Sequence, residues 1–221
     1  MHAATKTHGL LFAAEVLFPE AYHPGDYIYM DGASFADEQY NALIGTCTDL
    51  QALRMYETDA LFPRDLPLTR ATLVDTLNTG HYGIVNQIGH GYFFNMSVGD
   101  GNFTTVDADN LANAAHPFLL YGLNCASAAF DNSCLMERLL QNPGGGAVAT
   151  LGSTREAFPS AVNTYQQEFF AQLYCEGEHR VGRLVALSRL PFLAATAQNY
   201  LDRWTFENYT LLGDPALNLW S

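Results

Sequence analysis

Two short apolar runs in the middle of the chain each end in a side chain that can take part in catalysis. The first run, residues 83–89, is followed by His90, and the second, residues 118–124, is followed by Cys125. Runs of this length bounded by turn residues are typical of strands buried on both faces of a parallel sheet, although a short buried helix has the same pattern. We interpret both as strands, and no other feature of the sequence constrains the fold as much.

The segment between the two runs predicts a strand–helix–strand crossover. Asp107 can cap a short helix whose apolar residues recur at helical spacing until Pro117 ends it. These apolar residues are Ala108, Leu111, Ala112 and Ala115. A crossover of this kind is right-handed and makes its two strands parallel, so their carboxyl ends lie at one edge of the sheet. Ligands of open α/β sheets bind at that edge, and we therefore expect His90 and Cys125 to meet there.

A thiol beside an imidazole has a defined chemistry. The thiolate is the nucleophilic form of cysteine, and a nearby His can supply the base that generates it near neutral pH. We therefore expect Cys125 to be the nucleophile and His90 its acid and base. The N–H groups of Gly91 and Cys125 are the expected oxyanion donors, and we expect Cys125 to lie close to the start of a helix through residues 134–140.

Five blocks of sequence resemble the gingipain family, which is part of the caspase-like group of cysteine peptidases. The His-Gly pair and the Cys that follows an apolar strand carry the resemblance, with Asn124 standing where the family usually has Ala. A lone His-Gly pair would mean little, whereas five blocks in the right order are specific. They are residues 86–91, 124–127, 145–149, 152–155 and 211–215.

The resemblance implies a caspase-like α/β fold, a three-layer sandwich with a mostly parallel central sheet and helices on both faces. It implies a cysteine endopeptidase that hydrolyses peptide bonds through an acyl-enzyme on Cys125, with His90 and Gly91 in the catalytic site. It also implies that the loop 152–159 forms the wall of the pocket for the residue before the scissile bond. The substrate-binding candidates are Asn124, Ser153, Arg155, Glu156 and Phe158.

Several carboxylates are candidates for supporting roles. Asp31 or Glu15 can orient His90 as a third catalytic group, although loop carboxylates are more often simply solvated. Asp31 and Glu156 are also candidates for a carboxylate at the floor of the pocket, which would favour cleavage after basic residues. Arg155 is a competitor, because it can bind an acidic substrate residue or pair with another carboxylate and leave the pocket indifferent to charge.

Composition limits the classes of partner. The chain has 221 residues, of which 48% are hydrophobic, and a formal net charge of −13. This length suffices for one domain with a sizeable core, and we expect residues 1–221 to form a single catalytic domain. An acidic chain lacks the basic patch that nucleic acid or anionic membranes require, and no apolar stretch is long enough for a membrane helix. The expected partner is a protein or peptide substrate.

The cysteines do not have the spacing of a metal site. They lie at positions 47, 125, 134 and 175, so we expect neither zinc nor a required cofactor. We interpret Cys134 and Cys175 as small buried apolar residues. Asp100 and Asn102 lie in a Gly-rich turn that can hold a structural calcium ion, although a plain turn is the simpler interpretation.

No signal peptide is recognisable before the first apolar run, residues 9–18. Gingipain-like peptidases are exported, so the resemblance implies a fragment of a longer exported precursor, secreted or held at the cell surface, with flanking domains. Two alternatives to a hydrolase stay open at this point. One is a sortase-like transpeptidase, which shares the chemistry up to the acyl-enzyme, and the other is a non-catalytic interaction module.

The remaining pattern predicts alternating strands and helices, with a loop over residues 20–35 at the edge of the site. Further strands are expected at residues 9–15, 53–56, 147–151 and 209–212. A helix is well indicated from Thr69, with Gly80 past its end. Other helices are expected at residues 37–50, 162–173 and 181–188, and Pro191 should end or kink the last of them.

Overall fold

A seven-stranded sheet forms the centre of the computed structural model, which describes residues 9–21, 23 and 25–219. Its strands are β1 (Gly9–Ala14), β4 (Ala52–Tyr56), β5 (Leu66–Pro67), β6 (Tyr82–Ile88), β10 (Phe118–Leu123), β11 (Ala147–Ser153) and β12 (Tyr209–Gly213). They follow the order β12-β11-β10-β6-β1-β4-β5, and only the pair of β11 and β12 is antiparallel. The expected mostly parallel sheet is therefore confirmed.

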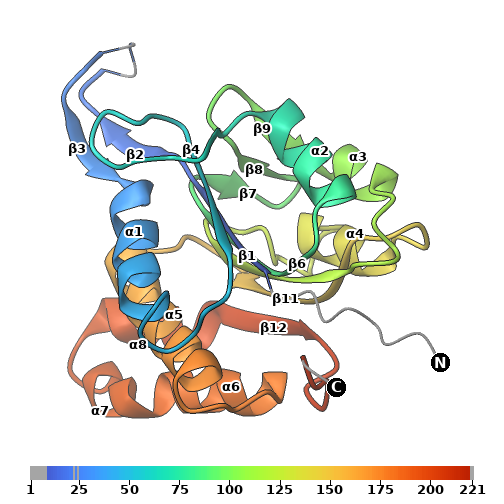
Figure 1. Cartoon of the computed structure of the whole chain (residues 1–221). Helices are drawn as coiled ribbons and strands as arrows, with labels where there is room; N and C mark the ends of the chain where they lie inside the picture. Colours follow the sequence, from blue (N-terminus) through green and yellow to red (C-terminus); the bar gives the residue numbers. More distant parts are fainter. Residues whose placement is uncertain (1–8, 22, 24, 220–221) are drawn as a thin grey trace.

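Helices cover both faces of this sheet (Figure 1). One face packs against α1 (Gly32–Leu43), α5 (Pro159–Tyr174) and α6 (Val181–Arg189). The other packs against α2 (Arg70–Thr79), α3 (Thr105–Asn110) and α4 (Leu135–Gln141). The chain after α6 continues through η1 (Leu190–Phe192), α7 (Leu193–Thr196) and α8 (Tyr200–Asn208), so Pro191 does divide the helical region as expected.

Along β6 and β10, side chains alternate between two apolar clusters, one on each face. Ile84 and Ile88 belong to the cluster under α1 and α5, whereas Val85 belongs to the opposite one. Both strands are buried on both faces, which explains why they read as nearly continuous apolar runs.

A chain of buried amides connects β6 to the two helices on the α1 and α5 face. Gln166 donates to Asn86 of β6 at 2.5 Å, and Gln39 of α1 donates to Gln166 at 2.7 Å and to Asn163 at 3.1 Å. Buried polar groups need such partners, because an unpaired one loses its hydration without compensation. The network therefore joins α1, α5 and the strand that precedes His90.

The region expected to be a loop at residues 20–35 is instead a hairpin followed by a helix. Its strands are β2 (Val16–Pro19) and β3 (Ile28–Asp31). The helix expected at 37–50 begins earlier, because Asp31 caps it by accepting a hydrogen bond from the N–H of Ala33 at 2.9 Å. The hairpin projects from the carboxyl edge of the sheet, at the upper left of Figure 1.

The helix expected between Asp107 and Pro117 begins earlier and already ends at Asn110. Thr104, not Asp107, caps α3, and Asp107 completes the capping box from inside the helix. Between β6 and α3 the chain forms a small antiparallel sheet of β7 (Gly91–Tyr92), β8 (Asn95–Ser97) and β9 (Asn102–Thr104). The turn between β8 and β9 contains Gly99 at a φ of +75°, a conformation that favours glycine.

Cys175 is not the buried apolar residue that we expected. It is exposed at the end of α5 and forms a disulfide with Cys47, which lies in the loop after α1. The two residues are 128 positions apart in sequence, and spacing alone does not reveal a pairing of this kind. Cys134 is buried, as expected. Within the described part of the chain, no helix has the length and apolarity to cross a membrane.

Replacing both Cys47 and Cys175 by Ala should lower the free energy of unfolding by about 4 kcal/mol, because the bond closes a long loop and restricts the unfolded chain. Urea titration followed by circular dichroism measures this change. Cys134→Ser is a poor control because Cys134 is buried, so the matched control is the wild type after mild reduction, which should unfold at the midpoint of the double variant. A loss of less than about 1 kcal/mol would contradict the prediction.

Candidate active site

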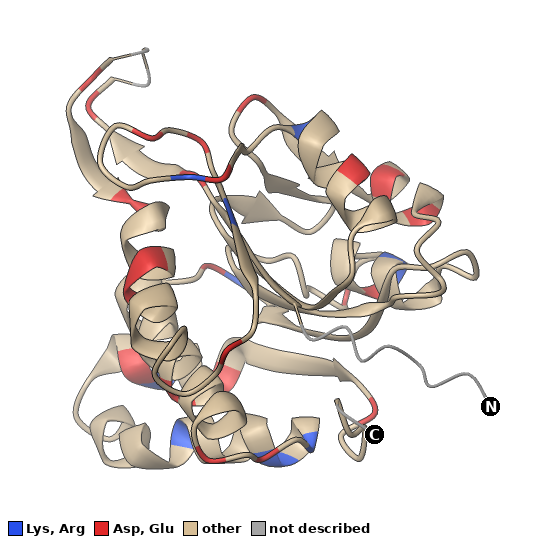
Figure 2. Cartoon of the chain, viewed as in Figure 1, with Lys and Arg blue, Asp and Glu red and all other residues tan. Residues whose placement is uncertain are grey.

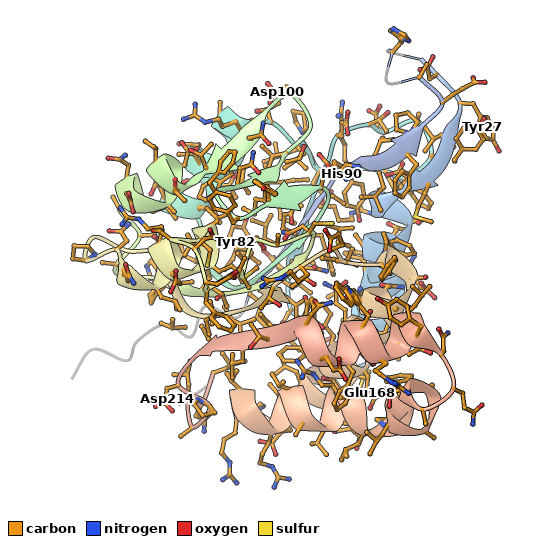
Figure 3. The ribbon with its side chains drawn as sticks, turned by 180° about the vertical axis from the view of Figure 1, so that it is seen from behind. Tyr27, Tyr82, His90, Asp100, Glu168 and Asp214 are labelled. Atoms are coloured by element: carbon orange, nitrogen blue, oxygen red, sulfur yellow. A yellow bond between two sulfur atoms is a disulfide. The ribbon has the colours of Figure 1, made fainter. Side chains whose placement is uncertain are left out.

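The register of β6 and β10 brings His90 and Cys125 to one level at the carboxyl edge. Leu123 pairs with Ile88, and the N–H of Gly89 donates to the Leu123 carbonyl at 3.0 Å. Each reactive residue lies two positions after its paired residue, so the alternation of side chains directs both toward the face with α1 and α5. Figure 3 shows His90 at this edge of the sheet, beside the base of the hairpin.

The segments that carry the two residues touch. A Cβ placed on Gly91 would lie 2.9 Å from the carbonyl oxygen of Cys125 and 3.0 Å from the Cβ of Asn124. Any larger residue at position 91 would therefore push the two segments apart. The close approach of the Cys125 backbone is therefore a structural reason for glycine at this position.

The imidazole of His90 is oriented by the backbone of the hairpin. Its Nε2 lies 2.7 Å from the carbonyl oxygen of Leu17, and the ring of Phe18 meets the imidazole edge-on with centroids 5.6 Å apart. Since a carbonyl oxygen can only accept, Nε2 carries the proton in this arrangement and Nδ1 keeps its lone pair. Nδ1 is thus the ring nitrogen that can take a proton from Cys125.

Glu15 binds the backbone N–H of His90 and not the imidazole ring. The carboxylate is only 3% exposed and accepts hydrogen bonds from the N–H of His90 and, at 3.4 Å, from the N–H of Gly99. Burial raises the pKa of Glu15, and hydrogen bonds from Ser97 and His90 oppose this shift without cancelling it. Glu15 therefore fixes the start of the segment that presents the imidazole.

Asp31, the other candidate for a third catalytic group, caps α1 with one carboxylate oxygen. Its second oxygen, Oδ2, is buried and accepts no hydrogen bond. The side chain is 6% exposed, and burial raises the pKa of Asp31. The atom that holds the His90 ring is the Leu17 carbonyl, so a role of Asp31 in orienting the imidazole stays a prediction.

Cys125 does not lie at the start of a helix, contrary to our expectation, because α4 begins only at Leu135. The thiol instead accepts a hydrogen bond from the N–H of Ala157 at 3.4 Å, which holds the sulfur against the loop after β11. The next residue, Ala126, has a φ of +54°, and its N–H donates to the Arg155 carbonyl at 2.8 Å. A left-handed residue that is not glycine is strained, and this one turns the chain sharply after the nucleophile.

Two of the substrate-binding candidates have buried side chains. Asn124 and Ser153 are each 1% exposed. Asn124 donates to Gln87 at 2.6 Å and accepts from Ser127, while Ser153 donates to Asn208. These bonds fix the loops on both sides of Cys125, so a contact of either residue with substrate would have to come from its backbone.

The other candidates lie on the loop that joins β11 to α5. Arg155 forms a two-pronged ion pair with Asp131, with N–O distances of 3.0 and 3.1 Å. Glu156 is exposed, and its carbonyl accepts a hydrogen bond from the indole of Trp204 at 2.8 Å. Phe158 is partly buried at the start of α5. The loop is thus held from both sides, with its backbone against the Cys125 thiol.

Asp100 and Asn102, the calcium candidates, both have protein partners. Asp100 accepts from the N–H of Arg70 at 3.0 Å, and the side-chain oxygen of Asn102 accepts from Asn95 at 3.1 Å. Over residues 9–219, apart from positions 22 and 24, no three His, Cys, Asp or Glu side chains gather in a way that could hold a metal ion.

The raised pKa of Glu15 predicts how its contribution to stability depends on pH. A carboxyl group whose pKa rises on folding above its ordinary value of 4.5 holds its proton longer in the folded chain than in the unfolded chain. Its contribution is therefore complete below about pH 4.5 and declines as the pH rises through the raised value. Gln at this position does not titrate, so the stability of the wild type relative to Glu15→Gln should fall over that range.

Urea titrations of both proteins at a series of pH values from 4 upward measure this difference. Glu207→Gln, at an exposed position of α8, is the matched control and should show no such trend. A stability of the wild type that increases relative to Glu15→Gln with rising pH would contradict the prediction.

Known proteins share the family and the fold of this chain. The family model for peptidase family C25 matches residues 4–220 of the chain. No curated protein matches significantly. Among solved structures, the Arg-specific cysteine proteinase gingipain R superposes with a TM-score of 0.74 at 20% identity, covering 96% of this chain and 47% of that one. The present chain therefore spans about half the length of gingipain R.

Two more structures place the fold. A complex of pro- and mature domains of a gingipain from Porphyromonas gingivalis gives a TM-score of 0.71 at 20% identity, covering 96% of this chain and 48% of that one. Caspase-1 from Spodoptera frugiperda gives 0.54 at 11% identity, covering 95% and 90%. The caspase-like fold expected from the sequence is confirmed. Because the family model spans nearly all of the sequence, the chain belongs to peptidase family C25, the gingipain family.

Proposed function

We propose that the chain is a cysteine endopeptidase with Cys125 as nucleophile and His90 as acid and base. The observation that carries this proposal is the shared position of the two residues at the carboxyl edge, together with the hydrogen bond that Nε2 of His90 donates to the Leu17 carbonyl. That bond leaves Nδ1 as the ring nitrogen that can act as a base, and the Ala157 N–H holds the Cys125 sulfur in place. Family membership favours the same reaction.

The mechanism derives from these groups. Nδ1 of His90 takes the proton of the Cys125 thiol, and the thiolate attacks the peptide carbonyl carbon. N–H groups of Gly91 and Cys125 hold the oxyanion, a contribution of about 100-fold to 1000-fold in rate. The protonated imidazole then gives its proton to the leaving amine as the C–N bond breaks, which leaves a thioester on Cys125. Water then attacks the thioester carbonyl carbon while His90 takes its proton. The C–S bond breaks, the acyl half leaves as a carboxylic acid, and His90 returns the proton to the Cys125 sulfur.

The charges around the site favour a basic residue before the scissile bond. Glu156 is an exposed carboxylate on the loop after β11, which borders the acyl side of the site, and it can pair there with a substrate cation. Asp31 on the hairpin, whose oxygen Oδ2 is buried without a partner, is the alternative carboxylate. Arg155 is already paired with Asp131, so it is less available to bind an acidic substrate residue. Figure 2 marks mainly acidic residues on the hairpin and the upper loops, in keeping with the net charge of −13.

The disulfide supports an extracellular location. Disulfides form and persist in oxidising compartments, and the Cys47–Cys175 bond therefore favours a secreted or surface-exposed protein. The chain spans about half of gingipain R, and a related structure contains both pro- and mature domains. We infer that flanking domains of the same precursor accompany this chain.

Cys125 should react selectively with iodoacetamide, since it is partly exposed whereas Cys134 is buried and burial raises the pKa of the Cys134 thiol. Peptide mapping by mass spectrometry identifies the labelled residue.

Cys125→Ala should abolish turnover of a peptide library, and His90→Ala should lower kcat/KM by about 100-fold to 10,000-fold. Equal labelling of Cys125 and Cys134, or full activity of Cys125→Ala, would contradict the proposal. Product masses with an added amine separate hydrolysis from transpeptidation.

Fluorogenic peptides that differ only in the residue before the cut should be cleaved faster after Arg or Lys than after Asp or Ala. Glu156→Gln is the informative variant, because Gln keeps the size of the side chain but carries no charge. It should lower kcat/KM for Arg and Lys peptides by about fivefold and leave the Ala peptide nearly unchanged. Asp31→Asn, which keeps the cap of α1, tests the alternative carboxylate. Faster cleavage after Asp than after Arg would refute the preference and indicate Arg155 instead.

A further inference from the structure

We propose that Phe18 determines specificity on the leaving-group side of the site, where it binds a large apolar side chain directly after the scissile bond. This inference rests on the proposed peptidase function and adds a substrate preference to it. It depends on three properties of the structure: the order of the strands, the position of Phe18 beside His90, and the exposure of its ring.

The strand order sets the direction in which a substrate crosses the site. Across the sheet, the loop after β11 comes first, then Cys125 after β10, then His90 after β6, and finally the hairpin after β1 (Figure 1). The carbonyl carbon under attack lies at Cys125, and the leaving nitrogen must reach the imidazole of His90 that protonates it. The substrate therefore runs from the β11 side toward the β1 side, and the residue after the cut faces the hairpin.

Phe18 is the aromatic residue of the hairpin that meets His90. The two rings are edge-on, with centroids 5.6 Å apart, and the preceding residue, Leu17, holds the imidazole through its carbonyl at 2.7 Å. Because this bond ties β2 to the catalytic base, the position of Phe18 relative to the leaving nitrogen is fixed. The pairing of Phe18 with Met30 across the hairpin adds to that fixation.

Packing within the chain leaves part of the Phe18 ring exposed to solvent. Phe18 is 41% exposed, whereas the adjacent Leu17 is 1% exposed. A phenyl ring whose only role was to support the imidazole would be stabilised by burial, so its open surface is available to a ligand. A Leu or Phe side chain after the cut would cover this surface, while Gly would leave it in water. Removal of that much apolar area from water corresponds to a preference of about tenfold.

Another exposed aromatic residue of the same hairpin provides a matched control. Tyr27 is 68% exposed, meets the ring of Tyr29 edge-on at 5.2 Å between centroids, and points away from the body of the protein (Figure 3). It shares the hairpin and the aromatic character of Phe18 but lies away from His90. Loss of its ring should therefore change neither the rate nor the preference.

The test uses internally quenched peptides with one constant acyl half, ending in Arg, and with Gly, Leu or Phe directly after the cut. For the wild type, kcat/KM should be about tenfold higher with Leu or Phe than with Gly. Phe18→Ala should reduce this ratio to about one, because kcat/KM should fall more for the Leu and Phe peptides than for the Gly peptide. Phe18→Leu should retain a preference for apolar residues, and Tyr27→Ala should match the wild type.

The outcomes separate this inference from the proposed function. Cleavage of the Gly, Leu and Phe peptides by the wild type at equal rates would overturn the inference and leave the peptidase function standing. An equal loss of rate for all three peptides in Phe18→Ala would also overturn it, since Phe18 would then only hold His90 in place. If the wild type cleaves none of the peptides, nor a mixed peptide library, the proposed function fails and the inference fails with it.

Discussion

The register between β6 and β10 is the constraint on which the rest of the site depends. Side chains alternate along a strand, so a shift of one residue would turn either His90 or Cys125 to the opposite face. The pairing of Leu123 with Ile88 resists this shift, because a shifted strand would have to move its apolar side chains from one core cluster to the other. The core of the protein and the geometry of the candidate dyad are thus fixed by the same contacts.

Polar groups add precision to what the apolar core determines. Asn86 interrupts an apolar strand, yet it is paired with Gln166, and through it with Gln39 of α1. On the opposite face, Gln87 of the same strand accepts from Asn124, beside the nucleophile. These two amides anchor β6 to α1 and α5 on one side and to the Cys125 segment on the other. The hydrogen bonds of these polar side chains therefore fix the position of the strand more specifically than apolar packing alone would.

The parts of the fold with strong local patterns could be predicted from the sequence. The buried strands that end before His90 and Cys125 are recognisable because few other structures combine short apolar runs with turn residues, and Thr69 signals its helix by capping it. The start of α1 escapes prediction because Asp31 lies next to a hairpin rather than next to an apolar helical run. The disulfide escapes prediction because its partners are distant in sequence.

Within the site, the sequence indicates which side chains carry the chemistry but not what holds them. The Leu17 carbonyl that orients His90 belongs to the backbone, and every residue has one, so nothing in the sequence marks it. The partner of Arg155 is an exposed aspartate on another loop, and the indole of Trp204 reaches the Glu156 carbonyl from α8. Contacts of this kind depend on the three-dimensional path of the chain rather than on a motif.

The Cys47–Cys175 disulfide joins the distal ends of α1 and α5, whose opposite ends begin at the walls of the site. One wall is the hairpin that orients the imidazole, and the other is the loop that contacts the thiol. Under the proposed function the molecule contains sulfur atoms with opposite redox requirements, since Cys125 would react only when reduced whereas the Cys47–Cys175 disulfide exists only when oxidised. The protein would then need an environment whose redox potential leaves the Cys47–Cys175 disulfide intact and the Cys125 thiol reduced.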